Sequence, residues 1–288
     1  MIVEWLLEWK LLIIIVVFIG LGLLEQRFPY ARPQYFYMPH NLRFQNIASV
    51  WLQMMIARLK GREGRNIGLW LINGFCSAII ILPLSYWASE VSFDGLFKDV
   101  LGLDFNVNWR GSEWSFGWFL LFDILLLDLF TYWWHRFNHE IAFLWRFHRV
   151  HHMDERLDTT TAVRFHFGEV ILSCMARIPV IIVFDLSFVT IIIYETILLI
   201  SSLFQHSNIR LDEQLEQHLN KLIVTPAWHW MHHHHPRIDT DSHYANLFTI
   251  WDRLFKSDPG HKRYAQMPIG LKGFKDKGLK KLLLVPFK

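Results

Sequence analysis

The sequence predicts an all-α fold: an integral membrane helical bundle with a histidine-rich, di-metal cap on its cytoplasmic side. Three observations support this prediction. Of the 288 residues, 52% are hydrophobic and only 19% are charged, which is unlike an ordinary soluble domain. Several apolar stretches reach roughly 20 residues, the length that crosses a bilayer. Most of the 16 histidines lie near the ends of these stretches.

The net charge argues against a nucleic-acid-binding protein, and the cysteines argue against a protein built on disulfides or on a CxxC metal site. The net charge of +3 is small and dispersed along the chain, so no nucleic-acid partner is expected. Cys76 and Cys174 lie far apart, each within an apolar segment. Two such cysteines form neither a disulfide framework nor a CxxC metal site. Any metal site must therefore use other side chains.

The N-terminal third contains two expected membrane spans. Residues 67–89 form the clearer one, because no charge interrupts them. Residues 5–24 form the other, although Glu8 and Lys10 interrupt its first half. Lys10 can extend its ammonium group toward the headgroup layer while its stem stays in apolar surroundings. The start is not basic and no small-x-small cleavage site follows, which favours a span over a signal peptide.

Two further apolar regions follow. Residues 114–134 are a candidate span that carries Asp123 and Asp128. Residues 168–204 are long enough for a hairpin that breaks near Asp185. Each arm of this hairpin is short, so it either crosses the bilayer twice or re-enters and leaves on the same side.

Loop charges orient the spans. Residues 25–65 are rich in arginine and lysine and residues 90–113 are mostly acidic, so the positive-inside rule puts the first loop in the cytoplasm. Residues 135 and 206 then reach the same cytoplasmic face, which the lysine-rich C-terminal tail shares. We expect a multi-pass protein of a bacterial inner membrane or, in a eukaryote, of the endoplasmic reticulum. Residues 41–60 are either an interfacial amphipathic helix or a helix packed on the core.

Three groups of histidines recur at helical spacing. They are His135 and His139; His148, His151 and His152; and His229, His232 and His233. Residues three or four apart share one face of a helix, so each group can direct several rings to one ion. Adjacent residues diverge by about 100° on a helix, so an HxxHH unit can serve two ions. The three groups therefore predict a site for two metals.

The type of ligand narrows the choice of metal. Imidazole suits iron, zinc, copper and nickel, whereas the scarcity of nearby carboxylates argues against magnesium and calcium. Histidines outside the spacing are expected to have other roles. His40, His218 and His261 are expected at the surface, and His234 and His235 are expected to support the ligands or to face solvent.

Longer motifs around these histidines resemble a known family. They are "DLFTYWWHRFNHEIAFLWRFHRVHH", "RFHFGE", "FQHSN", "TPAWHWMHH" and "DSHYANLFTIWDRLF". Together they resemble the fatty acid hydroxylase/sterol desaturase superfamily of membrane-bound, histidine-rich di-iron oxygenases. The resemblance runs from about Asp128 to the C-terminus, while the first hundred residues agree only in hydropathy. It divides the chain into an N-terminal transmembrane region, residues 1–113, and a catalytic domain, residues 114–288, which includes the membrane hairpin 168–204.

The resemblance implies which residues hold iron. The implied ligands are His135, His139, His148, His151, His152, His206, His229, His232 and His233. Asp128 precedes His135 by seven residues on the same helical face, and is expected in the catalytic site as the acceptor for the second ring nitrogen of a ligand. Weaker candidates for supporting contacts or for ion pairs are Arg164, His166, Glu169, Asn208 and Asp241.

The sequence departs from the family pattern at three places. Phe167 stands where proline is usual, and His243 stands where asparagine is usual. The tripeptide "FKS", residues 255–257, stands where "FGT" is common. His243 is either a further ligand or a simple polar substitute.

The resemblance implies hydroxylation or desaturation of an alkyl C–H bond in a lipid-like substrate, such as a fatty acyl chain or a sterol. A side-chain base cannot remove hydrogen from an unactivated carbon, so two Fe²⁺ ions with O₂ as cosubstrate would supply the oxidant. The sequence has neither a dinucleotide-binding fingerprint nor a cysteine set for an iron–sulfur cluster. An external electron donor, a ferredoxin, a cytochrome or a reductase, is therefore expected.

Two other functions compete with this one. A membrane transporter of zinc, or another metal-handling protein, would also be rich in histidine. Transporters place their ligands near the bilayer midplane, whereas these histidines follow the ends of expected spans. A membrane metal hydrolase would need about three protein ligands and an open position, far fewer than the histidines present.

Overall fold

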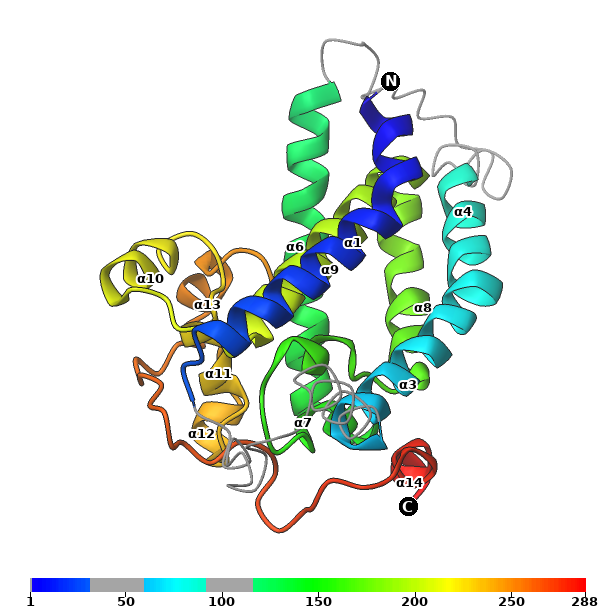
Figure 1. Cartoon of the computed structure of the whole chain (residues 1–288). Coiled ribbons are helices and arrows are strands. Elements are labelled where there is room, and N and C mark those ends of the chain that lie inside the picture. The colour runs from blue at the N-terminus through cyan, green and yellow to red at the C-terminus, as the bar shows by residue number, and fades with distance from the viewer. Residues whose placement is uncertain (1, 32–59, 92–115) are drawn as a thin grey trace, which may run out of the picture.

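The computed structural model describes residues 2–31, 60–91 and 116–288, and these are mostly helical (Figure 1). The helices are α1 (Ile2–Arg27), α3 (Arg62–Cys76), α4 (Leu82–Glu90), α6 (Phe116–Glu140), α7 (Ala142–His152), α8 (Phe167–Val183), α9 (Phe188–His206), α10 (Glu213–Leu219), α11 (Pro226–His232), α12 (Arg237–Thr240), α13 (Ile250–Leu254) and α14 (Leu279–Leu284). Within these ranges the only extended pairings are isolated bridges, without a strand. The prediction of a helical fold is confirmed for this part of the chain.

Three features named in the sequence fall outside the described residues. They are His40, all but the last residue of the segment 41–60, and residues 92–113 of the acidic loop.

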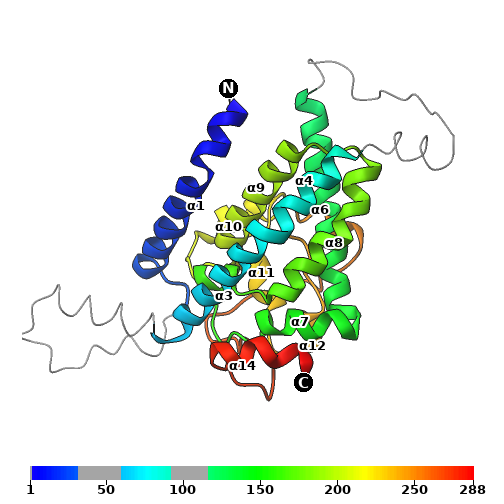
Figure 2. The ribbon, with the colours of Figure 1, turned by 90° about the vertical axis from the view of Figure 1, so that its right-hand side faces the viewer.

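The long helices lie alongside one another, and short helices gather at one end. Figures 1 and 2 show α3 and α4, α6, α8 and α9 side by side, with α7, α12 and α14 at their lower end. The contacts agree, since α4 packs on α8, α6 packs on α7 and α9, and α1 packs on α9. In Figure 1, α6 ends near the lower end and α8 begins there. The structure therefore brings the ends of several long helices to one place.

α3 and α4 form one long apolar helical stretch. A π-helical turn, Ser77–Ile81, joins them without a break in the helix, and such turns are insertions within α-helices. The whole stretch, residues 62–90, is long and apolar enough to cross a membrane. Leu71 and Phe75 are 66% and 68% exposed, as expected of side chains that face lipid. This stretch contains the expected span at residues 67–89.

α8 and α9 form the expected helical hairpin. The imidazole of His166 accepts the amide of Gly168 at the start of α8, and the hydroxyl of Ser187 accepts the amide of Thr190 at the start of α9. Between the helices Asp185 has a φ of 50°, a left-handed conformation that aspartate tolerates. α9 is the second helix long and apolar enough to cross a membrane.

The other two expected spans correspond to α1 and α6. Residues 5–24 lie within α1, a helix of 26 residues, and residues 114–134 overlap α6, a helix of 25 residues. Among the described residues, α3–α4 and α9 are the two helices that meet the length and hydropathy of a span. That any of these four helical segments crosses the membrane stays a prediction.

Apolar contacts hold the bundle and its lower end together. Leu127 of α6, Ile181 of α8 and Tyr194 of α9 meet in one buried cluster with Ala88 of α4. A second cluster joins α3, α7 and α14, through residues such as Val150, which is fully buried. In water, burial of a side chain of this size contributes about 1.5–3 kcal/mol. The C-terminal helix α14 is thereby fixed against α7, which carries the first HxxHH motif.

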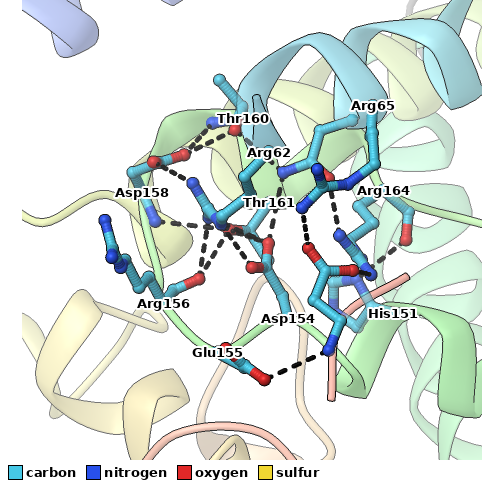
Figure 3. A network of polar contacts seen from close by, with 12 residues as sticks. Arg62, Arg65, His151, Asp154, Glu155, Arg156, Asp158, Thr160, Thr161 and Arg164 are labelled. Carbon is cyan, nitrogen blue, oxygen red and sulfur yellow. Dashed lines mark hydrogen bonds and ion pairs between the residues drawn. The ribbon is translucent and has the colours of Figure 1, made fainter. Parts of the chain in front are cut away.

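A buried polar network ties the start of α3 to the loop after α7 (Figure 3). The guanidinium of Arg62 pairs with Asp154 and with Asp158, and its Nη2 lies 2.8 Å from Oδ2 of Asp154. Burial alone would raise the pKa of Asp154, but the positive charges of Arg62 and Arg164 outweigh it, and the pKa lies below its ordinary value. Asp158 also caps the short helix Thr159–Val163. This loop follows directly on His151 and His152.

Candidate metal centre

Nine buried histidines converge in two adjacent groups. The first contains His135, His139, His148, His152 and His232, and the second contains His151, His206, His229 and His233. Within each group, one ring nitrogen of every member lies within 4.8 Å of those of the others. These are the nine histidines that the resemblance implied as ligands. Their role as ligands stays a prediction, while their convergence is a fact of the structure.

Helix geometry divides neighbouring histidines between the two groups. On α7, His151 and His152 belong to different groups, and their ring planes are 90° apart. His232, the last residue of α11, and His233, which caps it, also belong to different groups, again at 90°. Adjacent residues point about 100° apart around a helix axis. Each HxxHH unit therefore contributes to both groups, as its spacing indicated.

Backbone carbonyls hold four of the rings. Nδ1 of His135 donates to the carbonyl of Tyr244 at 2.8 Å, and Nδ1 of His232 donates to that of Ser242 at 2.7 Å. Nδ1 of His206 and Nδ1 of His151 donate to the carbonyls of Ser202 and Arg164, at 2.8 and 3.3 Å. A carbonyl can only accept, so the proton of each ring lies on Nδ1. Nε2 of each ring then carries a lone pair.

Two carboxylates hold further rings of the first group. Nδ1 of His148 donates to Oε1 of Glu169 at 2.7 Å, and Nδ1 of His139 donates to Oδ1 of Asp241 at 3.3 Å. Such acceptors fix the tautomer of a histidine and raise the basicity of its other nitrogen, as they do beside bound metals. Glu169 and Asp241 thus take the supporting positions that were expected for them.

The lone pairs of Nε2 atoms face one another at short range. Nε2 of His206 lies 3.1 Å from Nε2 of His151 and 3.0 Å from that of His229. Nε2 of His152 lies 3.1 Å from Nε2 of His148. His206 and His151 both carry their protons on Nδ1, so no hydrogen bond can join their Nε2 atoms across this gap. Two nitrogens bound at 90° to one metal, at about 2.1 Å each, would lie about 3.0 Å apart.

The chemistry of this donor set therefore fits metal ions. Nε2 of His139 and Nε2 of His232 are buried and have no hydrogen-bond partner among the described residues. Burial, and then the neighbouring imidazoles, lower the pKa values of His152 and His233 well below the ordinary histidine value. These rings are neutral at pH 7, which is the form that binds metals.

Asp128 corrects one expectation. It was expected to accept a hydrogen bond from a ligand histidine, but it accepts from the amides of Leu247 and Phe248, both at 3.1 Å, and from Nε1 of Trp251 at 2.7 Å. The reason is that Nδ1 of His135, on the same helical face, already donates to the carbonyl of Tyr244. Asp128 therefore positions the segment that carries this carbonyl, and it forms no hydrogen bond with a histidine of the two groups.

Asp252 plays a similar part in the same segment. It accepts from the amide of Tyr244 at 2.8 Å, from Nε1 of Trp228 at 2.7 Å and from the hydroxyl of Ser257 at 2.8 Å. Sequence reasoning did not single out this residue, although it lies in the quoted motif "WDRLF". Two buried carboxylates thus fix residues 242–257 beside the histidines.

The remaining candidates have structural contacts. The side chain of Arg164 binds Asn66, Asp276 and the carbonyl of Val150. His166 caps α8, and Asn208 exchanges two hydrogen bonds with the backbone of Ala31. None of these three side chains contacts the two histidine groups within the described ranges, although the backbone carbonyl of Arg164 does.

The outlying histidines also lie outside both groups. His234 is buried and donates to Asp239 at 2.7 Å, while His235 is half-buried, with its amide bound to the carbonyl of Pro268. His218 and His261 are exposed, as expected. His243 contacts Ser242 and Asp258 rather than either histidine group, so it is a polar substitute with its own structural partners.

A polar cavity of about 370 Å³ opens next to the first group. It is lined by Arg136, His139, Glu140, Arg237, Asp241, Tyr244, Lys256 and Ser257. His139 is the one member of the two groups that reaches this cavity, so the cavity lies directly beside the centre.

Comparison with known proteins places the histidine-bearing part of the chain. Residues 120–257 match the family described as "Fatty acid hydroxylase". Alkylglycerol monooxygenase of Danio rerio is 32% identical over 151 residues, which are 52% of this chain and 32% of that protein. The Homo sapiens protein of the same name is 31% identical over 155 residues, with the same shares covered.

A bacterial protein is also similar. Ornithine lipid hydroxylase OlsE of Rhizobium tropici is 24% identical over 186 residues, which are 64% of this chain and 55% of that protein. The chain thus spans about a third of the length of the alkylglycerol monooxygenases and about half that of the bacterial relative. No solved structure matches the chain.

Proposed function

The chain belongs to the fatty acid hydroxylase superfamily, and from this premise we propose that it is an O₂-dependent membrane oxidoreductase that hydroxylates an alkyl C–H bond of a lipid. The observation that carries the proposal is the convergence of nine buried histidines in two adjacent groups. Neither relative's name mentions a desaturase; one names a monooxygenase and the other a lipid hydroxylase. This favours hydroxylation over desaturation.

The proposed cofactor is a pair of iron ions. His135, His139, His148, His152 and His232 would hold one ion, and His151, His206, His229 and His233 would hold the other. When bound, the two ions would reduce O₂ with electrons from an external donor and oxidise the substrate. A ferredoxin, a cytochrome or a reductase is the proposed donor. Nitrogen ligands without thiolates are compatible with iron.

The residues of the chain would prepare the centre for this chemistry. Glu169, Asp241 and the carbonyls of Ser242 and Tyr244 keep protons on the Nδ1 atoms of their histidines, so that the Nε2 atoms stay free for metal. Burial excludes bulk water from the rings, which limits the loss of oxidant to solvent. The long apolar helices beside the centre would admit an alkyl chain from the bilayer.

The proposed arrangement in the membrane follows the loop charges. α1, α3–α4, α6 and the hairpin α8–α9 would span or enter the bilayer, and the histidine groups would lie at the cytoplasmic face. Residues 1–113 would form the transmembrane region and residues 114–288 the catalytic domain. Two apolar helices and lipid hydroxylase relatives support a membrane location.

Comparative lipid analysis tests the proposal. Cells that express the chain under oxygen are expected to accumulate a lipid 16 mass units heavier than its precursor, and cells that express His232→Ala are expected to lack it. The control is His218→Ala, an exposed histidine outside both groups. Identical lipids in all three strains, under oxygen and with the proteins present at equal levels, would count against catalysis.

Metal analysis tests the cofactor separately. Protein purified without oxygen is expected to contain two irons per chain, with the Mössbauer signal of a coupled pair. Zinc in place of iron, together with zinc uptake into liposomes, would identify a metal transporter instead.

A further inference from the structure

We propose that the cavity beside His139 binds the anionic head group of the lipid substrate, and that Lys256 is its specificity-determining residue. The proposal rests on the proposed function and names the class of substrate: an amphiphile with a phosphate or carboxylate at its polar end. It concerns binding alone and involves no chemical step.

The charged side chains around the cavity include one more cation than anions. Three cationic side chains, Arg136, Arg237 and Lys256, face two anionic ones, Glu140 and Asp241. Each arginine has a carboxylate four residues further on: Arg136 pairs with Glu140 at 2.7 Å, and Arg237 pairs with Asp241 at 2.8 Å. Lys256 is exposed and has no carboxylate partner among the described residues. The cavity therefore has one positive charge that the protein leaves available to an anion.

The backbone of Lys256 has an unfavourable conformation. Its φ is 55°, a left-handed conformation that glycine adopts freely and that lysine rarely adopts. It follows Phe255, the residue that caps the end of α13, and helices commonly have glycine in this conformation at that position. A lysine at such a position costs conformational energy. A function of its side chain would explain why lysine is present there. Unfavourable backbone conformations of this kind cluster at ligand sites.

The neighbouring contacts show that this backbone is held firmly. The amide of Ser257 donates to the carbonyl of Asp252 at 2.8 Å, and the carbonyl of Ser257 accepts from the amide of His243 at 2.9 Å. The hydroxyl of Ser257 lies 2.8 Å from that of Tyr132. Main chain and side chain of Ser257 are thus fixed next to Lys256. The backbone that carries the side chain of Lys256 is therefore fixed at the edge of the cavity.

The position and size of the cavity indicate a substrate head group. At about 370 Å³ it lies at the small end of ligand pockets, roughly 300–1,000 Å³, so it admits a small polar group. His139 lines it, and Asp241 joins Arg237 to Nδ1 of His139. An oxyanion bound here would lie beside the centre. The carbon to be hydroxylated would then lie close to the head group rather than deep in the chain.

Equilibrium binding to the protein in phosphatidylcholine nanodiscs tests the inference. The probes are radiolabelled 1-O-dodecylglycerol 3-phosphate and its neutral analogue, 1-O-dodecylglycerol. The natural chain is expected to bind the phosphate at least about tenfold more tightly than the neutral probe. Lys256→Gln and Lys256→Gly are expected to reduce this preference by at least about fivefold, while Lys256→Arg keeps it. Lys262→Gln, an exposed lysine outside the cavity, is the matched control and should bind like the natural chain.

Melting temperatures separate binding from folding. Lys256→Gly is expected to melt at the same or a higher temperature than the natural chain, because glycine relieves the left-handed backbone. A lower melting temperature would give Lys256 a structural role and overturn the inference. Equal loss of both probes, or no loss of either, would overturn it as well.

Two further arms identify the source of the anion and separate this inference from the proposed function. Millimolar inorganic phosphate is expected to leave binding of the lipid phosphate unchanged; displacement at that concentration would indicate a site for free anions rather than for a head group. Binding is measured on metal-free protein and on anaerobic, iron-loaded protein, so it does not depend on turnover. A preference for the phosphate without any hydroxylated product would refute the proposed function and leave this inference standing.

Discussion

The carboxylate of Asp128 accepts a hydrogen bond from the indole nitrogen of Trp251 at 2.7 Å, and with this bond α6 holds the segment that anchors the first histidine group. The same carboxylate binds the amides of Leu247 and Phe248. Tyr244 and Ser242, whose carbonyls hold His135 and His232, precede these residues closely in the chain. A carboxylate that forms no hydrogen bond with His135 or His232 thus influences the position of both.

Asp128→Asn is expected to destabilise the protein by about 1.5–3 kcal/mol, because the amide offers only one oxygen to three buried donors and carries no charge. Iron content should fall with stability, since the carbonyls of Tyr244 and Ser242 become less well placed. Thermal unfolding and iron analysis measure both effects. Asp185→Asn makes the same change at an exposed turn where asparagine tolerates the positive φ, and it should be neutral. Equal effects of the two variants would contradict this account.

Glu169→Gln is expected to weaken metal binding by about 10- to 100-fold, the usual effect of altering the acceptor behind a metal-bound histidine. The glutamine oxygen can still accept from Nδ1 of His148, so the tautomer is kept while the negative charge is lost. Competition with a graded series of chelators measures the affinity. Glu213→Gln, on the exposed face of α10, is the control. An unchanged affinity in Glu169→Gln would remove Glu169 from the centre.

His233→Ala and His234→Ala are adjacent changes with opposite expected results. His233 belongs to the second histidine group, so its loss should lower the iron content well below that of the natural chain. His234 binds Asp239 instead, so its loss should leave the iron content as it is. Iron per chain and the Mössbauer signal measure the difference. If both variants lost iron equally, the division of the histidine run into ligands and supports would be wrong.

Arg62→Met is expected to cost about 3–5 kcal/mol at pH 7, because it leaves the carboxylate of Asp154 buried without its main partner. The double variant Arg62→Met/Asp154→Asn should regain much of this loss, since no buried charge remains. Chemical unfolding of the three proteins in one detergent measures the energies. A double variant no more stable than the single one would show that packing, rather than charge, accounts for the loss.

The same pair predicts a dependence on pH. The pKa of Asp154 is lowered in the folded chain, so its contribution to stability is present above about 3.8, its ordinary value, and is lost as the pH falls through the lowered pKa. In Arg62→Met, burial raises the pKa of Asp154 instead, and protonation relieves the buried charge. The stability gap between the natural chain and Arg62→Met should therefore be widest at neutral pH and narrow toward pH 4. A constant gap from pH 7 to pH 4 would contradict this assignment.

The proposed arrangement in the membrane predicts two different sides for two exposed positions. Asp185→Cys places a thiol in the turn between α8 and α9, and Lys262→Cys places one near the C-terminus, in chains whose Cys76 and Cys174 are replaced by serine. In intact bacteria, a membrane-impermeant thiol reagent should label position 185 alone if the hairpin crosses the bilayer. Opened membranes should allow labelling of both. Labelling of neither position in intact cells would indicate a re-entrant hairpin.

Most of the two histidine groups could be predicted from the sequence, because eight of the nine histidines recur at helical spacing. The positions of His148, His151 and His152 within one helix decide which rings diverge, and no tertiary contact is needed to see it. The break near Asp185 was predictable for the same reason, as a charge within an apolar run.

What could not be predicted depends on contacts between distant segments. The acceptors for His135 and His232 are main-chain carbonyls, which every residue carries, so no side chain marks Tyr244 or Ser242 for this role. Asp128 was placed on the correct helical face, but its partners lie at residues 247–251, more than a hundred residues away in the sequence. That Lys256 has no carboxylate partner in the cavity likewise depends on the tertiary structure, which brings α12 and α13 next to the end of α6.

The division of each HxxHH unit between the two groups has a consequence for how the centre fills. Because α7 and α11 each contribute rings to both groups, the first of the two proposed ions would order the helices that the second ion needs. Affinity for the second ion would then be greater than for the first, and chains with a single ion would be scarce at every iron concentration. Loading should follow a sigmoidal curve, with protein that is either empty or complete.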